Sequence, residues 1–282
     1  MHTIAIIQAR MGSSRLPGKV LLDIAGKPMV QHVIERTRLA HSLSMDGTGS
    51  TSGSVIVATT SDPADDPMAK FCEEQGVPCS RGSVHDVLDR YYQAAKAQQA
   101  SIVVRITADC PLIDPELIDQ TVRLVSEKHS PHTDFACNRL PPPFQRSFPI
   151  GLDVEVCTFA ALERAWHESS ETFHREHVMP YIYQDVHLEE PPAGQKTTRG
   201  SSPRGFKIAV LNHVPNYGTL RWTVDTAEDL AFIREIFSRL KDRTQFTWYD
   251  VLRVVENEPQ LAEINASIRH KTMTEIDRRA KH

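Results

Sequence analysis

Three cations and several small residues share one short stretch near the start of the chain, directly after an apolar run. The stretch reads IAIIQARMGSSRLPGK, and its loop carries Arg10, Arg15 and Lys19 around Gly12 and Ser13. A phosphate can reach backbone N–H groups only where side chains are absent or small, as they are here. Arginine binds two phosphate oxygens at once, whereas lysine acts as a movable point charge. The stretch therefore predicts a polyphosphate site.

The glycine spacing in this loop excludes two common nucleotide sites. The run GSSRLPGK fits neither the Walker A pattern nor the dinucleotide fingerprint, which argues against a P-loop ATPase and against an NAD enzyme. A basic surface loop that binds nothing is the alternative, because most loops of this composition only connect elements.

Two aspartates follow strand-like runs in the same manner. Asp109 ends the apolar run 101–107 in RITADCPLIDP, and Asp225 ends another in RWTVDTAED. Magnesium is usually held by one or two carboxylates together with phosphate oxygens and water. The two aspartates are therefore candidates for one Mg²⁺ site, although each could serve only as a turn residue.

Candidate acceptor-binding residues lie in the middle of the chain. Asp153 and Glu155 in GLDVEV are two apart on an expected strand, so they point to the same face. Such a pair could bind sugar hydroxyls, position a second metal or act as a base. Arg175 and His177 lie in a helical block next to tyrosines. The alternatives are a solvated strand face for the first pair and surface or capping groups for the second. The histidines form no HxxxH pair, so zinc is not indicated.

Composition limits the class of protein. The chain has 282 residues and an apolar fraction of 40%, which is enough for a substantial core. A net charge of −4 and a pI near 6.4 argue against a nucleic-acid surface. The cysteines are widely spaced, without a CxxC pair or a secretory leader, and predict reduced thiols in the cytoplasm. No apolar run is long enough for a membrane helix.

The elements that must position these residues alternate along the first half. Val- and Ile-rich runs alternate with amphipathic stretches, which is typical of βαβ units and predicts a mostly parallel sheet with helices on both faces. Strands are expected at 4–8, 54–60, 77–80 and 101–107, and helices at 28–40, 63–75, 83–98 and from Pro115 onward, with Asp114 as its cap.

The second half is less regular. Thr226 and Asp229 resemble a capping box that opens a helix to Leu240, and Thr247 is expected to cap another. We expect a flexible excursion at 41–53, a proline-rich substrate-covering loop at 141–151, a strand at 151–159, helices within 158–184, an irregular stretch at 189–205, strands at 206–211 and 219–225, and a charged terminal helix at 260–282.

Several motifs, in order over residues 1–240, resemble the cytidylyltransferase family of the spore-coat-polysaccharide type, which is related to the synthetases of CMP-activated sialic acid and deoxyoctulosonate. They are QARMGSSRLPGK, VATT, RGS followed by VLDRY, RITADCPLIDP, GLDVEV, REHVMPY and LRWTVDTAEDL. Two positions depart from the family pattern: Ala108 stands for a usual glycine and Met179 for a usual threonine.

The resemblance implies a Rossmann-like nucleotidyltransferase fold in one domain at 1–245, with an acceptor and dimerisation insertion at 138–205 and a helical extension at 246–282. It also implies that a homodimer transfers CMP from CTP to an acidic sugar with Mg²⁺, in cell-surface or spore-coat polysaccharide biosynthesis. A glycosyltransferase is one alternative, although it would usually carry an Asp-x-Asp pair where TADCP has one carboxylate. A non-catalytic nucleotide-binding module is the other.

The resemblance also assigns roles to individual positions. Residues expected at the nucleotide and its phosphates are Ala9, Arg10, Gly12, Ser13, Arg15 and Lys19, with Arg10, Arg15 and Lys19 as the catalytic cations. Ala58 and Thr59 are expected near the base, and Arg81, Gly82 and Ser83 near the base or ribose. Asp109 and Asp225 are expected on magnesium. The acceptor is assigned to Asp153, Glu155, Arg175 and His177.

Overall fold

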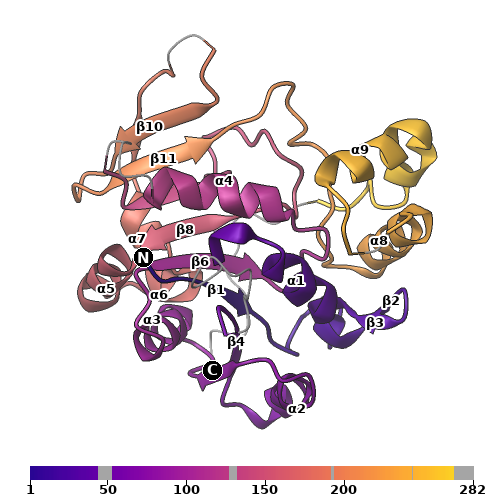
Figure 1. Cartoon of the computed structure of the whole chain (residues 1–282), viewed down its shortest axis with the longest axis horizontal. Coiled ribbons are helices and arrows are strands. Elements are labelled where there is room, and N and C mark those ends of the chain that lie inside the picture. The colour runs from indigo at the N-terminus through magenta and orange to yellow at the C-terminus, as the bar shows by residue number, and fades with distance from the viewer. Residues whose placement is uncertain (44–52, 127–131, 192–193, 243, 270–282) are drawn as a thin grey trace.

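One nine-stranded sheet runs through the molecule, in the order β5-β4-β1-β6-β8-β7-β11-β10-β9 (Figure 1). The computed structural model describes residues 1–43, 53–126, 132–191, 194–242 and 244–269. A separate two-stranded sheet joins β2 (Asp23–Ile24) to β3 (Lys27–Pro28). The expected mostly parallel sheet is thus confirmed.

Four neighbouring strands of the sheet are parallel. They are β5 (Cys79–Gly82), β4 (Val55–Thr60), β1 (Thr3–Gln8) and β6 (Ile102–Thr107). Gln8 pairs with Ala58 on one side and with Thr107 on the other, so three strands end at one edge. Ligands of open α/β sheets bind at this edge.

The other strands are mixed in direction. They are β8 (Glu155–Thr158), β7 (Phe135–Cys137), β11 (Lys207–Leu211), β10 (Thr197–Ser201) and β9 (His187–Leu188). β8 runs antiparallel to both β6 and β7, and β11 runs parallel to β7. β6, β7 and β11 therefore point the same way, and their ends share the edge described above.

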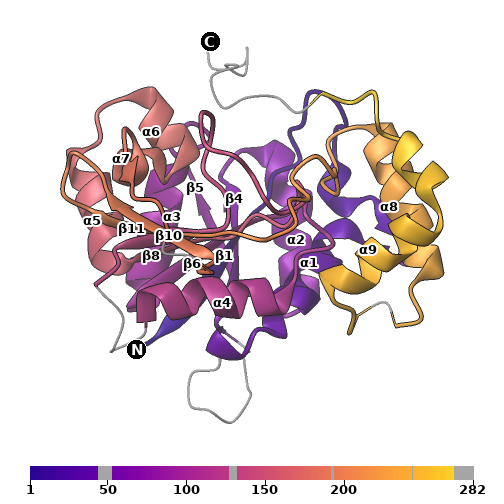
Figure 2. The ribbon, with the colours of Figure 1, turned by 90° about the horizontal axis from the view of Figure 1, so that it is seen from above.

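Helices cover both faces, as expected from the two-residue period of a buried strand. Ile4 and Ile6 pack into one core, whereas Ala5 and Ile7 pack into the other. The first face carries α3 (Val87–Ala97), α5 (Phe159–Glu168), α6 (Thr172–His177) and α7 (Pro180–Tyr183) (Figure 2). The second carries α1 (Met29–Arg38), α2 (Asp66–Glu74), α4 (Pro115–Ser126), α8 (Ala227–Arg239) and α9 (Trp248–Asn257).

Three predicted helix starts are confirmed. Thr226 and Thr247 each open a helix through a complete capping box, with Asp229 and Asp250 as the returning carboxylates. Asp114 caps α4, because one of its carboxylate oxygens accepts a bond from the Glu116 N–H at 2.9 Å. Its other oxygen accepts the N–H of Trp248 at 2.7 Å, so the same side chain also anchors α9.

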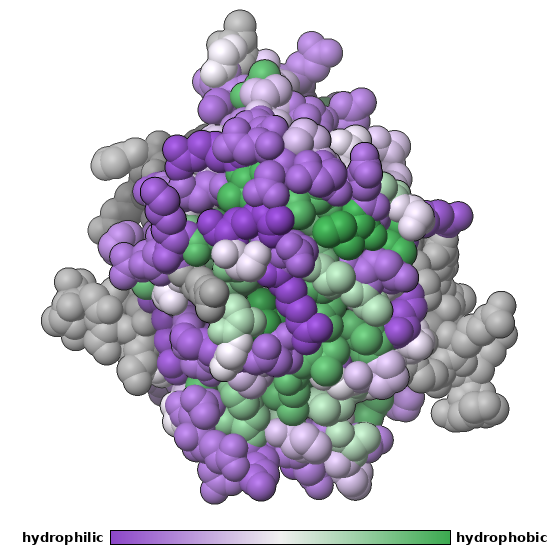
Figure 3. Space-filling model, turned by 90° about the vertical axis from the view of Figure 1, so that its right-hand side faces the viewer, coloured by the Kyte–Doolittle hydropathy of each residue, from purple (hydrophilic) through white to green (hydrophobic). Residues whose placement is uncertain are grey.

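α8 and α9 stand side by side at one end of the molecule. The face they form has apolar side chains at its centre and polar ones around them (Figure 3). A pocket of about 450 Å³ opens between Phe232 of α8, Val255 of α9 and Leu220. Trp248 and Val251 of α9 belong to the same hydrophobic core as Ile106 of β6. The domain limits at 245 and 246 stay predictions. Within the described ranges, every helix falls short of the length and apolar character needed to cross a bilayer.

Two expected strands are wrong in extent. The strand expected at 151–159 begins only at Glu155, because Gly151 takes φ +106° and Asp153 turns to an ion pair with Arg146. The segment expected as a strand at 219–225 forms only an isolated bridge between Arg221 and Ile150. Its backbone groups instead bind other parts of the chain: the Val224 N–H donates to the Asp109 carbonyl, and the Arg221 carbonyl accepts a bond from Asn265.

The remaining differences concern irregular segments. The stretch expected to be irregular at 189–205 contains β10, whose small polar residues carry no apolar alternation. In place of the terminal helix there is a short 3-10 helix at Pro259–Glu263, and residues 270–282 lie outside the described residues. Most of the expected excursion at 41–53 lies outside them too. The proline-rich loop at 141–151 is confirmed as having neither helix nor strand.

Candidate nucleotide site

The loop after β1 is closed by its own backbone and by an aspartate from the 3-10 helix Pro63–Asp65, which follows the neighbouring strand β4. The Gly18 N–H donates to the Met11 carbonyl at 2.9 Å, and Gly18 takes φ +69°, which favours glycine. The Met11 N–H donates to Asp65 at 2.6 Å. Among the described residues, the N–H groups of positions 12 to 15 have no acceptor. The loop therefore offers a row of backbone donors to an anion.

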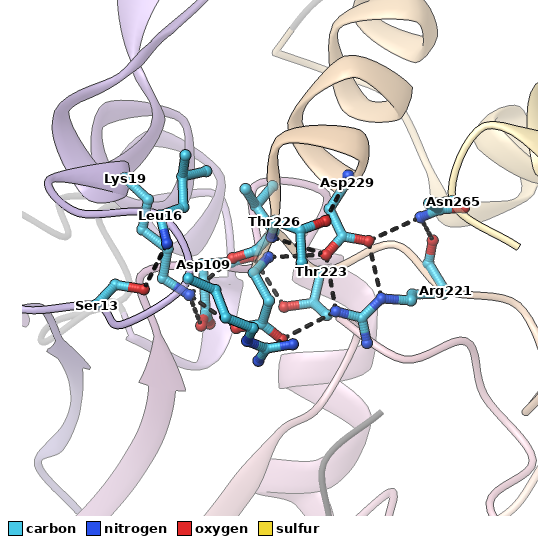
Figure 4. A network of polar contacts seen from close by, with 12 residues as sticks. Ser13, Leu16, Lys19, Asp109, Arg221, Thr223, Thr226, Asp229 and Asn265 are labelled. Carbon is cyan, nitrogen blue, oxygen red and sulfur yellow. Dashed lines mark hydrogen bonds and ion pairs between the residues drawn. The ribbon is translucent and has the colours of Figure 1, made fainter. Parts of the chain in front are cut away.

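Lys19 connects this loop to both predicted metal ligands. Its Nζ donates to Asp109 Oδ2 at 2.7 Å (Figure 4). The same Nζ also donates to Asp225 Oδ1 at 3.0 Å and to the carbonyl of Val224 at 2.7 Å. The Lys19 side chain is only 11% exposed. The two aspartates thus converge as the sequence predicts, with an ammonium group between them.

Asp225 is surrounded by cations. Besides Lys19, Arg15 approaches its Oδ2 at 3.0 Å and Arg221 at 2.9 Å. Arg221 also forks onto the buried Asp229, with both bonds at 2.8 Å. The chain segments that carry these groups come from the loop after β1, from the end of β6 and from the start of α8.

Burial and ion pairing act in opposite directions on this cluster. Burial lowers the pKa of Lys19, but Asp109 and Asp225 more than compensate and raise it above its ordinary value. Burial raises the pKa of Asp225, but Lys19, Arg15 and Arg221 hold it well below its usual range. Lys19 and Asp225 are therefore both charged at neutral pH.

A pocket of about 560 Å³ opens at the same edge of the sheet. Arg10 and Gly12 of the loop line it together with Asp65. Arg105 of β6 and His177 close another side. Its volume falls within the range of about 300–1,000 Å³ typical of small-molecule sites. Of the predicted residues, the structure brings Arg10, Gly12 and His177 to this pocket.

The residues expected near the base lie in β4 and at the end of β5, where their described contacts are with the protein itself. Ala58 and Thr59 are fully buried in β4, and the Ala9 N–H donates to the Ala58 carbonyl at 3.1 Å. Arg81 donates to the Thr60 carbonyl at 2.8 Å. Gly82 and Ser83 follow it at the end of β5, where a Cβ on Gly82 would come within 2.8 Å of the Arg90 side chain.

Three of the four acceptor candidates are ion-paired. Asp153 pairs with Arg146, Glu155 with Arg105 at 2.5 Å, and Arg175 with Asp86 at 2.5 Å. The structure therefore does not place Asp153 and Glu155 together on one strand face. Only His177 lines the pocket, and burial lowers its pKa.

Sequence reasoning missed three residues of this edge. Asp65 binds the Met11 N–H and accepts a bond from the Thr60 hydroxyl, so it ties the loop to β4. Arg221 and Asp229 orient Asp225. The only signal for Asp65 is a cluster of acidic residues in SDPADDP. Arg221 and Asp229 lie within the motif LRWTVDTAEDL, but the motif by itself assigns them no role beside Asp225.

The other chemistry weighed from the sequence has no support in the described part of the chain. All five cysteines there are free, and burial raises the pKa of Cys110 well above its ordinary value. No group of three or more His, Cys, Asp or Glu side chains that could hold a metal occurs among the described residues. A metal at this edge would therefore depend on two carboxylates and on oxygens supplied by a ligand.

The parallel sheet, the anion-accepting loop and the converging charges define an α/β protein of the nucleotidyltransferase fold. A family model described as cytidylyltransferase matches residues 4–245, and the chain belongs to this family, as its motifs predict.

Individual relatives agree with this assignment. The chain is 28% identical over 258 residues to the spore coat polysaccharide biosynthesis protein SpsF of Bacillus subtilis, covering 91% of this chain and 95% of that protein. It is 30% identical over 266 residues to the 3-deoxy-manno-octulosonate cytidylyltransferase of Polynucleobacter necessarius, covering 84% and 96%. A solved cytidylyltransferase from Leptospira borgpetersenii matches with a TM-score of 0.77 and 29% identity, covering 96% of this chain and 100% of that one.

Proposed function

We propose that this chain transfers CMP from CTP to a hydroxyl group of an acidic sugar or a similar small acceptor and releases pyrophosphate. The observation that carries the proposal is the meeting of Lys19, Asp109 and Asp225 at the sheet edge beside the loop after β1. A triphosphate needs both backbone donors and cations, and the loop after β1 carries both.

In the proposed reaction, the acceptor oxygen attacks the α-phosphorus of CTP. A new P–O bond forms, the bond between the α-phosphorus and the oxygen bridging to the β-phosphate breaks, and pyrophosphate leaves with the electron pair. The proton of the acceptor hydroxyl is released to solvent. Arg10 lines the pocket, while Arg15 and Lys19 lie on the adjoining ion network. These cations neutralise charge on the α-phosphate and on the leaving pyrophosphate, which is the largest contribution that fixed groups make in such sites.

The two aspartates suit a magnesium ion. The ammonium of Lys19 lies within 3.0 Å of both carboxylates, so a cation already fits between them. We propose that Asp109 and Asp225 hold Mg²⁺ when nucleotide is bound. The ion would neutralise phosphate oxygens there.

The acceptor side rests on the relatives and on the pocket. The relatives include enzymes named for 3-deoxy-manno-octulosonate, which is an acidic sugar, and a protein named for spore coat polysaccharide biosynthesis. We propose that His177 contacts the acceptor directly. Glu155 would act through Arg105, whereas Asp153 and Arg175 would first have to leave their present ion pairs. We further propose a homodimer, which light scattering tests.

Pyrophosphate release tests the proposal. The protein is incubated with Mg²⁺, a pool of acidic sugars and, in turn, CTP, UTP, GTP or ATP. We expect release with CTP alone, and a loss of about 100-fold or more for Lys19→Ala and Asp109→Ala. Consumption of a nucleotide-diphosphate sugar would identify a glycosyltransferase, and nucleotide binding without release would identify a non-catalytic module; either result contradicts the proposal.

A further inference from the structure

Lys19 has no hydrogen-bond donor left for a phosphate. An ammonium group carries three N–H donors. In the structure they go to Asp109 at 2.7 Å, to Asp225 at 3.0 Å and to the carbonyl of Val224 at 2.7 Å. A role for Lys19 on the triphosphate therefore requires it to give up at least one of these three bonds.

The described charges around Lys19 balance one another. Among the residues that the structure describes, Arg15, Lys19 and Arg221 form one connected set of ion pairs with Asp109, Asp225 and Asp229. Within this set, three positive and three negative charges cancel. A divalent metal entering this balanced network would meet an ammonium already bound to both of its carboxylate ligands.

We infer that Lys19 competes with the divalent metal for the pair Asp109 and Asp225, and that the nucleotide resolves the competition by drawing Lys19 to its phosphates. This inference rests on the proposed function, since it needs a triphosphate at the loop after β1. The pair is closed to metal in the nucleotide-free protein. Metal and nucleotide then enter together, and the free enzyme holds no metal of its own.

Two features of the chain permit the movement. Lysine has a flexible four-carbon stem, so its charge can move without a change in the backbone. The N–H groups at positions 12 to 15, which have no acceptor among the described residues, lie on the loop that leads into Lys19, so a phosphate bound there and Lys19 share one short segment of chain. When Lys19 leaves, Arg15 and Arg221 still contact Asp225 and keep it in place.

Metal binding without turnover tests the inference. Mn²⁺ is titrated into nucleotide-free protein, and unbound Mn²⁺ is measured by electron paramagnetic resonance. We expect Lys19→Met and Lys19→Gln to bind Mn²⁺ about 10-fold or more tightly than the wild type, because a charge in contact with both ligands is removed. Lys19→Arg keeps the charge and should bind as weakly as the wild type. Lys27→Met is the matched control, since Lys27 pairs with Glu35 outside the site.

A second titration at saturating CTP isolates the step that depends on nucleotide. The affinity of CTP itself for Mn²⁺ is common to all variants, so only the ratio between variants reports on Lys19. We expect the 10-fold advantage of Lys19→Met to shrink to about twofold or less. Thermal unfolding adds a readout independent of nucleotide: Mg²⁺ should raise the Tm of Lys19→Met and leave that of the wild type unchanged.

Equal Mn²⁺ affinities of the wild type and both neutral variants would overturn the inference. So would an advantage of Lys19→Met that CTP leaves unchanged. If the wild type still releases pyrophosphate from CTP, only the competition falls and the proposed function stands. If no nucleotide reacts while the neutral variants bind Mn²⁺ more tightly, the ion competition stands and the proposed function falls.

Discussion

Replacing Arg221 by methionine should destabilise the protein more than any other single arginine substitution at this edge. The Arg221 side chain is 6% exposed and forks onto Asp229, whose side chain is fully buried. Methionine fills a similar volume but removes the charge and the hydrogen bonds from Arg221 to Asp229 and Asp225. A buried carboxylate is then left without its main partner.

The loss of unfolding free energy depends on the hydrogen bonds that Asp229 retains in Arg221→Met. Breaking a buried ion pair costs about 3–5 kcal/mol. Asp229 still accepts bonds from Asn265 and from the N–H groups of Asp225 and Thr226, so we expect the lower end, about 3 kcal/mol. Arg221→Lys keeps the charge but loses the fork, and should cost about 2 kcal/mol.

Denaturant unfolding followed by circular dichroism measures the loss of unfolding free energy for Arg221→Met and for Arg221→Lys. Thermal unfolding should show a Tm lowered by about 6–12 °C for Arg221→Met. The matched control is Arg253→Met on α9, because Arg253 is 71% exposed and should change stability by no more than about 0.5 kcal/mol. Arg221→Lys should also slow pyrophosphate release about tenfold, since Asp225 loses an orienting partner. An Arg221→Met protein within about 1 kcal/mol of the wild type would refute the reasoning.

Three further predictions follow from the same contacts. Asp65→Ala frees the loop after β1 from β4 and should lower pyrophosphate release about 100-fold with a smaller change in Tm, as kinetics and calorimetry together would show. The pKa values of Asp225 and Asp229 lie below their usual range, so their ion pairs stabilise the fold above about pH 4, and urea titrations should show that contribution lost as pH falls further. Gly151→Ala places a Cβ within 2.6 Å of the Trp222 backbone at φ +106°, and should lower the urea midpoint clearly, whereas an unchanged midpoint would contradict it.

Much of the fold could be predicted because its signals are local. The apolar strands, the capping boxes at Thr226 and Thr247 and the cap at Asp114 all depend on residues within a few positions of one another. β10 could not be predicted from its own residues, since its stability comes from pairing with β11. The segment 219–225 has a strand-like sequence, yet it serves long-range contacts instead.

The sequence likewise predicts some features of the candidate site and not others. The convergence of Asp109 and Asp225 could be predicted, because both follow strand-like runs toward one edge. The position of Lys19 between them could not, since it depends on a contact with Asp225, 206 positions along the chain. The ion pair of Asp153 with Arg146 was equally invisible, because a two-residue spacing says nothing about a partner in a neighbouring loop.

The most direct test of the central claim is mass spectrometry of the product formed from CTP, Mg²⁺ and a pool of acidic sugars. The account predicts a CMP-linked sugar that appears in step with pyrophosphate, and its near loss in Asp109→Ala. A UMP-, GMP- or AMP-linked sugar formed equally well when UTP, GTP or ATP replaces CTP, or an Asp109→Ala protein with normal yield, would contradict it.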